Sequence, residues 1–212
     1  MRLYSYWRSS SSWRVRIALH LKQVPFAYLA VNLVAGAQAQ PEFVARNPQG
    51  MVPLLEWDEA GVTRCLSQSL AIIEYLDERF PAPSLLPGDA YARGRIRLLA
   101  EIINSGIQPY QNLSVLRRVK DEHGGDEKAF ARGFIERGLA AFDQQAAATA
   151  GRYTVGDSVS LADVCLVPQL AGARRFGADL SAVPRLVDIE TRLAALPAFK
   201  AAHADAQPDA TP

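Results

Sequence analysis

Four consecutive serines, Ser9-Ser10-Ser11-Ser12, stand where the N-terminal sequence changes from a strand pattern to a helix pattern. Aromatic and apolar residues precede them in a strand-like run, and the residues from Trp13 onward repeat at helical spacing. This change predicts hydroxyls and open backbone N–H groups at a helix N-terminus, where the helix dipole also stabilises an anion. No cysteine lies in this segment, so a thiolate held there would have to belong to a bound ligand. A polar loop that only caps the helix is the alternative interpretation.

Two later segments also carry features of a ligand site. A cis bond before Pro53 would turn the backbone of Val52 outward and leave its N–H and C=O free to pair with a peptide-like ligand. The alternative is a proline that simply enters an edge strand. Gln68-Ser69 comes one step before a helical pattern, so the Ser69 hydroxyl and the local N–H groups could hold a carboxylate. The alternative there is an ordinary N-cap.

The elements that must position these segments follow from hydrophobic periodicity. The first third of the chain is expected to run β-α-β-α-β-β-α, with strands at 2–7, 26–33, 52–57 and 62–65 and helices at 13–22, 41–46 and 69–79. Three prolines and a glycine at 80–88 predict a boundary. Helical patterns follow at 90–104, 126–149, 160–174 and 184–194, and a loose tail is expected from Ala201. We therefore expect an α/β domain at 1–80, a linker at 81–88 and an all-helical domain at 89–212. Ser160 and Asp163 form a capping box that we assign to folding.

Composition excludes several classes of function. The chain has 212 residues, 49% of them hydrophobic, and a net charge of +1, so it has material for a core but no basic field for nucleic acid. Cys65 and Cys165 lie in apolar runs, which favours reduced thiols packed as small hydrophobes. No His/Cys cluster has metal-site spacing, so no metal is expected. A strand pattern from Met1 and the lack of a long apolar run favour a cytoplasmic protein with no membrane partner.

Five motifs together resemble the zeta class of the glutathione transferase family. The resemblance covers nearly the whole chain and rests on the following segments: Ser9 to Leu19, Asn47-Pro48 with Val52-Pro53, Gln68 to Leu76, Gly106 to Leu116, and Leu161 to Gln169. The serine motif and the Gly106–Leu116 block are specific to the class, whereas the other motifs are shared by the wider superfamily. The resemblance implies a thioredoxin-like N-terminal domain that binds glutathione and an all-α C-terminal domain that covers the substrate.

The resemblance also implies roles for individual residues. Ser9 would donate a hydrogen bond to the glutathione sulfur and lower its pKa, with Ser10 and Ser11 at the same helix start. The remaining glutathione contacts would come from Val52 after Pro53 for the cysteinyl backbone, Gln68 and Ser69 for the γ-glutamyl end, Gln40 for the glycyl end, and Gln108 and Asn112 from the helical domain. Zeta enzymes commonly carry cysteine where this chain has Ser11; the change removes an accessory thiol and leaves the Ser9 hydroxyl in place.

The reaction implied by the resemblance is cis–trans isomerisation of a maleyl compound. A thiolate adds to the double bond, the resulting single bond rotates, and elimination returns the trans alkene. Because maleyl substrates are dianions, the site needs cations. Arg8, beside Ser9, is the first candidate, and Arg175 matches a position that related isomerases use for a substrate carboxylate; the alternative for Arg175 is a helix-end arginine that meets the dipole. Arg14 and Arg16 are expected in structural pairs or in solvent.

The segment from Gln108 to Leu113 looks like the maleylacetoacetate type, which would place the protein in tyrosine and phenylalanine breakdown. A maleylpyruvate isomerase, a general glutathione transferase acting on α-halo acids, and a non-catalytic binding protein remain alternatives. Zeta proteins resemble their superfamily in forming homodimers, so a homodimer is expected by analogy.

Overall fold

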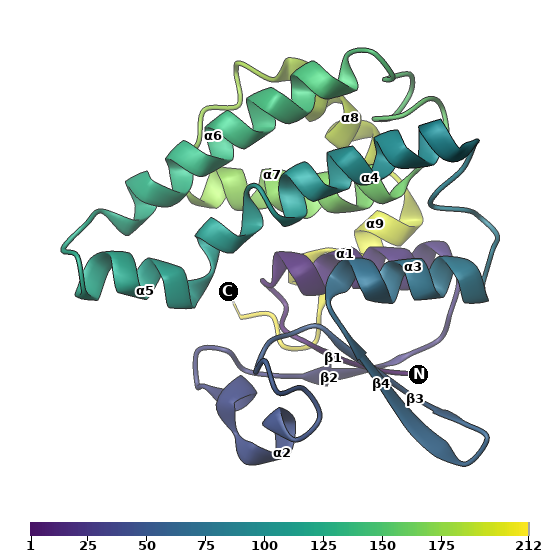
Figure 1. Cartoon of the computed structure of the whole chain (residues 1–212), viewed down its shortest axis with the longest axis vertical. Helices are drawn as coiled ribbons and strands as arrows, with labels where there is room; N and C mark the ends of the chain where they lie inside the picture. Colours follow the sequence, from purple (N-terminus) through teal and green to yellow (C-terminus); the bar gives the residue numbers. More distant parts are fainter. Residues whose placement is uncertain (212) are drawn as a thin grey trace. The chain divides into compact units, whose positions relative to one another are not determined.

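The computed structural model describes residues 1–211 as two compact units (Figure 1). Unit 1 comprises Met1–Pro83 together with the C-terminal segment that starts at Leu196, and unit 2 comprises Ser84–Ala195. None of the helices in these described residues is long and apolar enough to span a membrane.

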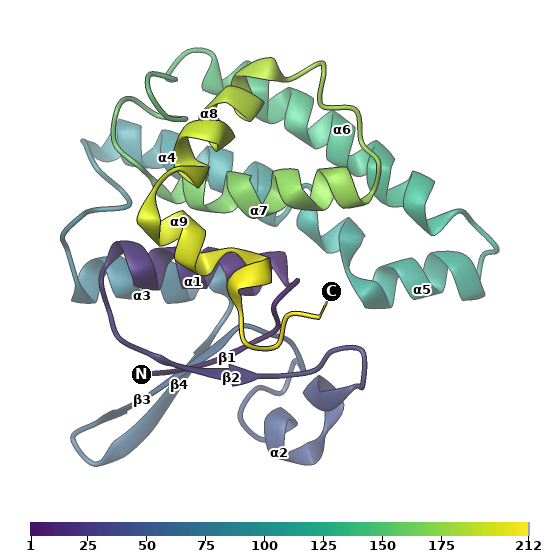
Figure 2. The same cartoon turned by 180° about the vertical axis from the view of Figure 1, so that it is seen from behind.

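A four-stranded mixed sheet forms the centre of unit 1. Its strands are β1 (Arg2–Ser5), β2 (Ala27–Ala30), β3 (Leu54–Glu59) and β4 (Val62–Ser67), in the order β2-β1-β3-β4. β1 is parallel to β2 and antiparallel to β3, and β3 is antiparallel to β4. Helices α1 (Ser10–Leu21) and α3 (Ser69–Arg79) cover one face, and α2 (Pro41–Val44) lies on the other (Figures 1 and 2). The expected β-α-β-α-β-β-α order and thioredoxin-like fold are confirmed.

The tight turn between β3 and β4 consists of Ala60 and Gly61 alone. Both residues have positive φ, 51° and 78°. Two such residues form the turn whose twist matches a β-hairpin, and glycine tolerates that conformation without penalty. Strand β3 therefore begins and ends two residues later than the predicted 52–57, and β4 runs two residues beyond the predicted end at Cys65.

Helix α1 begins at Ser10, three residues earlier than the periodicity indicates, because Ser9 is the N-cap. Its residues from Ser12 to Leu19 are all buried, including Arg14 and Arg16. The two arginines are therefore not in solvent. At the other end of the helix the buried Lys22 ammonium donates to the Asp77 carboxylate and to the carbonyl oxygens of Phe80 and Pro83. These bonds tie the end of α1 to the segment that follows α3.

Unit 2 is entirely helical in its regular structure. Its elements are α4 (Ala90–Asn104), the 3₁₀ helix η2 (Gln108–Gln111), α5 (Leu113–Asp121), α6 (Glu127–Ala146), α7 (Leu161–Arg175) and α8 (Pro184–Ala194). α7 is the central helix, since every residue from Leu161 to Leu170 is buried, and it packs against α4 and α8. Helix α5 was not predicted, because its charged sequence buries only Leu116.

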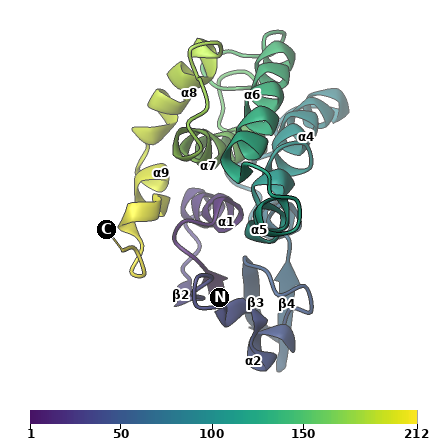
Figure 3. The same cartoon turned by 90° about the vertical axis from the view of Figure 1, so that its left-hand side faces the viewer.

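Residues 81–88, the predicted linker, contain no helix or strand and include the boundary between the two units, which lies between Pro83 and Ser84. The predicted extent of the helical domain needs a correction. The predicted helical domain does not extend to the C-terminus, because the chain returns to unit 1 at Leu196. The loose tail predicted from Ala201 is wrong as far as Ala206, because α9 (Pro197–Ala202) and η3 (Ala204–Ala206) occupy this part of the chain. Figure 3 shows α9 beside α1, where Phe199 and Ala202 are buried.

Candidate active site

The Ser9 side chain caps α1 and keeps a free hydrogen-bond donor. Its backbone is extended (φ −68°, ψ 114°), and its Oγ accepts a hydrogen bond from the Ser12 N–H at 3.2 Å. A hydroxyl has one O–H donor besides its acceptor lone pairs. No residue in the described range 1–211 accepts that O–H. Ser9 can therefore satisfy the helix and donate to a ligand at the same time.

The first turn of α1 adds backbone donors to this hydroxyl. The N–H groups of Ser10 and Ser11 have no hydrogen-bond partner within residues 1–211, as expected for the first turn of a helix. No acidic residue lies in that turn. Together with the helix dipole, these groups make the start of α1 a site that favours an anion.

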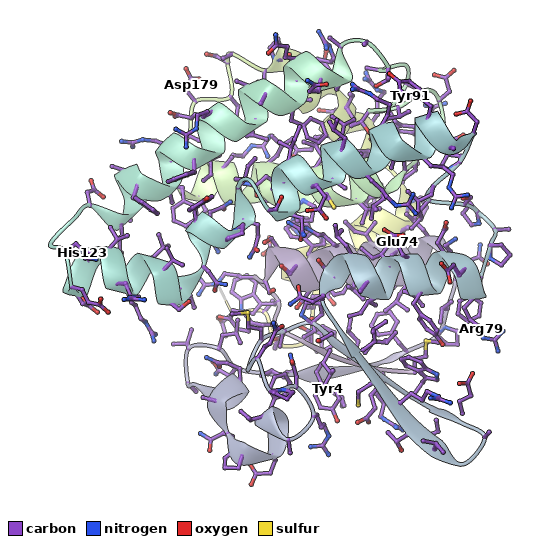
Figure 4. The ribbon with its side chains drawn as sticks, in the orientation of Figure 1. Tyr4, Glu74, Arg79, Tyr91, His123 and Asp179 are labelled. Atoms are coloured by element: carbon purple, nitrogen blue, oxygen red, sulfur yellow. The ribbon has the colours of Figure 1, made fainter. Side chains whose placement is uncertain are left out.

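A small apolar cluster places Val52 beside the loop that leads into Ser9. Tyr6, Val31, Phe43, Val52 and Leu54 are its buried members, and Trp7 packs against them. On the same side of the sheet the ring of Tyr4, visible in Figure 4, meets Phe43 edge-on with centroids 6.0 Å apart. One cluster thus joins the loop before Ser9, helix α2 and the segment that enters β3.

The Val52–Pro53 bond is cis, as the sequence interpretation allowed. Asn47 holds the segment before it, donating from Nδ2 to the Met51 carbonyl oxygen at 2.6 Å. The backbone N–H and C=O of Val52 make no hydrogen bond with any other residue that the structure describes. These groups are therefore available to an extended peptide-like ligand.

Gln68 and Ser69 form the start of α3. Gln68 has a positive φ of 72°, and its Nε2 donates to Gln49 Oε1 at 2.6 Å. Ser69 is buried, and its Oγ accepts from Arg14 Nη1 at 3.3 Å. The N–H groups of Ser69 and Leu70 have no partner within residues 1–211, and the Gln68 side chain does not cap them. A buried guanidinium below a helix N-terminus suits a carboxylate.

Two further candidates of unit 1 lie at the surface. Arg8 is exposed, its guanidinium carbon lies 5.0 Å from the centroid of the Trp7 ring, and Nη2 donates to the Tyr6 hydroxyl at 3.3 Å. Arg8 is adjacent to Ser9 in the sequence, and its guanidinium lies against the aromatic rings of Tyr6 and Trp7 in the preceding loop. Gln40 is exposed at the N-cap position of α2, where its side chain makes no capping bond.

The other three candidates belong to unit 2. Gln108 opens η2, and Asn112 occupies the N-cap position of α5 without a side-chain capping bond. Gln111, between them, is held to α7 by a bond from its Nε2 to Gln169 Oε1 at 3.0 Å. Arg175 is the last residue of α7 and is exposed, with its guanidinium carbon 5.0 Å from the centroid of the Phe176 ring.

Sequence reasoning left the two arginines of α1 open between structural pairs and solvent, and it misplaced one cysteine. A helix that is apolar on most faces and carries arginines must supply each with internal partners, so the signal for Arg14 and Arg16 was present. Cys165 is buried as predicted, but Cys65 is exposed on β4, where partial desolvation of the sulfur and the nearby Glu56 carboxylate raise the pKa of the thiol. No group of three or more potential metal-binding side chains gathers among residues 1–211.

Comparison with known proteins supports the same interpretation. Residues 1–78 match the family model described as the glutathione S-transferase N-terminal domain, and residues 111–204 match the corresponding C-terminal domain. A maleylacetoacetate isomerase from Rattus norvegicus is 48% identical over 209 residues, which cover 98% of this chain and 94% of that protein. The fold, the anion site and these matches show that the chain belongs to the glutathione S-transferase family.

Two solved structures identify the class within this family to which the chain belongs. The maleylacetoacetate isomerase of Anaeromyxobacter dehalogenans, with glutathione bound in its active site, is 52% identical with a TM-score of 0.93, covering 99% of this chain and 97% of that one. The holo structure of a maleyl pyruvate isomerase described as a bacterial zeta-class glutathione S-transferase is 42% identical with a TM-score of 0.94 and covers both chains completely. Similarity over the full length to these isomerases identifies the zeta class.

Proposed function

We propose that this protein is a glutathione-dependent cis–trans isomerase of maleyl compounds. The observation that carries the proposal is the cysteine-free anion site at the start of α1, where Ser9 keeps its O–H donor and two backbone N–H groups stay open. Such a site stabilises a thiolate, and because no cysteine lies in this segment the thiolate must come from a bound ligand. A second structure of the Anaeromyxobacter isomerase contains dicarboxyethyl glutathione and citrate in its active site. That ligand is a glutathione sulfur bearing a two-carboxylate chain, which is the product expected when a thiol adds across a maleyl-type double bond.

The residues of unit 1 fit glutathione as a peptide-like thiol. The free backbone groups of Val52 pair with the cysteinyl portion, and the start of α3, with Gln68 and Ser69, receives the γ-glutamyl carboxylate. Gln40 is assigned to the glycyl end, and Gln108 and Asn112 are assigned supporting roles from unit 2. Pro53 fixes the segment that carries Val52. A tripeptide needs hydrogen-bond donors for its backbone carbonyls and its carboxylates, and the Val52 backbone and the start of α3 supply such donors.

Glutathione, when bound, supplies the thiolate that adds to the maleyl double bond, allows rotation about it and then leaves. The Ser9 O–H donates to the sulfur and favours its ionised form. The Ser10 and Ser11 N–H groups and the dipole of α1 add to that stabilisation. The negative charge that develops on the conjugated carbonyl of the substrate requires donors, and Arg8 is the cation next to Ser9.

The physiological substrate is proposed to be maleylacetoacetate, with a role in the cytoplasm in tyrosine and phenylalanine catabolism and with a homodimer as the assembly. The Gln108–Leu113 segment and the named relatives support this choice. Maleylpyruvate is the second candidate, because a maleylpyruvate isomerase from Ralstonia is 42% identical over 99% of both chains. Conjugation of α-halo acids uses the same thiolate and is a further activity to examine.

The direct test is the isomerisation of maleylacetone, a stable analogue of maleylacetoacetate, with and without glutathione. We expect turnover that requires glutathione and is not supported by another small thiol, because the open groups at Val52 and Ser69 recognise the tripeptide. Maleylpyruvate and a chloro acid, assayed in parallel, rank the alternatives by kcat/KM. Binding of glutathione without turnover of either maleyl compound would contradict the isomerase proposal.

Replacing Arg175 with alanine is expected to raise the KM for maleylacetone about tenfold, because one substrate carboxylate loses its charge-assisted partner. Arg174→Ala is the matched control, since Arg174 is adjacent on α7 and its guanidinium is bound to Glu190. Steady-state kinetics of both variants, at saturating glutathione, provide the comparison. Equal KM values in the two variants would remove Arg175 from the substrate site.

A further inference from the structure

The C-terminal strap, defined as residues 196–211, is anchored on the loop that leads into Ser9. The Asp209 carboxylate has two donors: the Trp7 N–H at 3.1 Å to Oδ2 and the Tyr28 hydroxyl at 2.6 Å to Oδ1. Each carboxylate oxygen therefore has one partner in the sheet part of unit 1. Trp7 lies only two residues before Ser9, so the strap reaches the immediate neighbourhood of the anion site.

The carbonyl side of the same loop is held by a buried cation. Arg16 Nη2 donates to the Trp7 carbonyl oxygen at 2.9 Å, and Nη1 donates to that of Tyr6 at 3.3 Å. The Tyr6 carbonyl also accepts the Ser9 N–H at 3.0 Å. The Trp7 N–H is thus held by Asp209 and the Trp7 C=O by Arg16. Because Arg16 also binds the Tyr6 carbonyl, which accepts the Ser9 N–H, the backbone of Ser9 is tied to the same loop.

The strap itself is kept in place by side chain to backbone bonds. Arg16 Nε donates to the Ala202 carbonyl oxygen at 3.1 Å, at the end of α9. Gln207 Nε2 donates to the carbonyl oxygens of Ala201 and His203 at 3.0 and 2.8 Å, so the chain folds back after α9 and delivers Asp209 to Trp7. Burial lowers the pKa of Arg16 to about 10, which still leaves it cationic at neutral pH, with the Asp209 charge acting in the opposite direction.

We propose that Asp209 is a positioning residue for the thiolate site: by fixing Trp7, the strap sets the direction of the Ser9 hydroxyl toward the sulfur of bound glutathione. The inference rests on the proposed function, because a thiol must be bound at Ser9. A carboxylate suits this task, since it accepts one strong hydrogen bond on each oxygen and has no donor that would repel the Trp7 N–H. Small displacements of such a group are costly to catalysis even when binding is intact.

The test measures thiol ionisation directly, without a second substrate. Glutathione is added to the full chain at a series of pH values, and the ultraviolet absorbance of the thiolate gives the pKa of the bound thiol. In Asp209→Ala we expect that pKa to rise by about one unit, a roughly tenfold loss of thiolate below it. We expect the Kd of S-methylglutathione, which has no ionisable thiol, to change less than about twofold, because the other glutathione contacts are preserved.

Two further variants complete the design. Tyr28→Phe removes the second donor to Asp209, together with the bond between the Tyr28 hydroxyl and Ser5. It is expected to shift the pKa of the bound thiol in the same direction by a smaller amount, and it replaces Asp209→Ala if that variant does not fold. Asp205→Ala is the matched control, an exposed carboxylate of the same strap with no bond to the loop, and is expected to match wild type. An unshifted thiol pKa in folded Asp209→Ala, or in Tyr28→Phe if the former does not fold, would overturn the strap's role. A wild-type protein that leaves the thiol pKa at its free value would overturn the thiolate chemistry itself.

Discussion

Ser9→Ala is expected to lower kcat/KM for maleylacetone by about 100-fold or more, while glutathione stays bound. The Ser9 hydroxyl caps α1 and has no acceptor within residues 1–211, and its proposed contact with glutathione is at the sulfur alone. Its loss removes the hydrogen bond that favours the ionised thiol, so the pKa of bound glutathione should return toward the value of about 8.5 typical of a free cysteine thiol. Activity in the variant should therefore recover partly at high pH.

The measurement is a pH profile of kcat/KM together with the Kd of glutathione. Alanine also removes the N-cap, at a cost of about 1 kcal/mol in stability. Ser9→Thr controls for this, because threonine keeps both the cap and the O–H donor, and it should retain most of the activity. Ser11→Ala is the comparison for the neighbouring position. A Ser9→Ala enzyme with wild-type kcat/KM at neutral pH would rule out the assigned role.

Asp163→Ala is expected to produce the largest loss of stability of any substitution considered, about 3–5 kcal/mol. The carboxylate is completely buried at the start of α7, where it accepts the Thr154 N–H at 2.9 Å and both the N–H and the hydroxyl of Ser160 at 2.8 Å. Burial raises the pKa of Asp163, and these bonds act against that effect. Alanine leaves three donors without an acceptor inside unit 2.

Urea unfolding of the whole chain, followed by circular dichroism, measures this loss. Ser160→Ala is the matched control, since it removes one of the three bonds and keeps both backbone bonds to Asp163, and its expected cost is about 1 kcal/mol. If Asp163→Ala cost no more than Ser160→Ala, the capping box would not be the anchor of α7.

Helices with a strong apolar stripe and a clear start could be predicted from sequence. The bounds of α3, α4 and α8 agree with the expected ranges to the residue. The start of α1 was placed too late, because Ser10, Ser11 and Ser12 carry no apolar signal and only the capping geometry of Ser9 includes them in the helix. α5 and α9 escaped prediction, since neither has a long apolar periodicity.

The residues of the candidate site also fall into two groups, those that could be predicted from the sequence and those that could not. The serine run, Val52-Pro53 and Gln68-Ser69 could be named as candidates from the sequence, because each is a local departure from a regular pattern. Each also leaves backbone hydrogen-bonding groups without a partner within residues 1–211. Arg16 and Asp209 were not, because their bonds to the Trp7 backbone depend on tertiary structure that brings sequence-distant residues together. A local pattern can show that a buried charge needs partners, but it cannot say which distant residue supplies them.

Because the chain returns to unit 1 at Leu196, unit 1 can be completed only after all of unit 2 has been synthesised. Unit 2 is continuous, whereas unit 1 is completed only by the segment that begins at Leu196. A nascent chain that has left the ribosome up to residue 195 can form all of unit 2, but Arg16 still lacks the Ala202 carbonyl and the Trp7 N–H still lacks Asp209. The N-terminal anion site is therefore the last part of the molecule to mature, although its serines are among the first residues made.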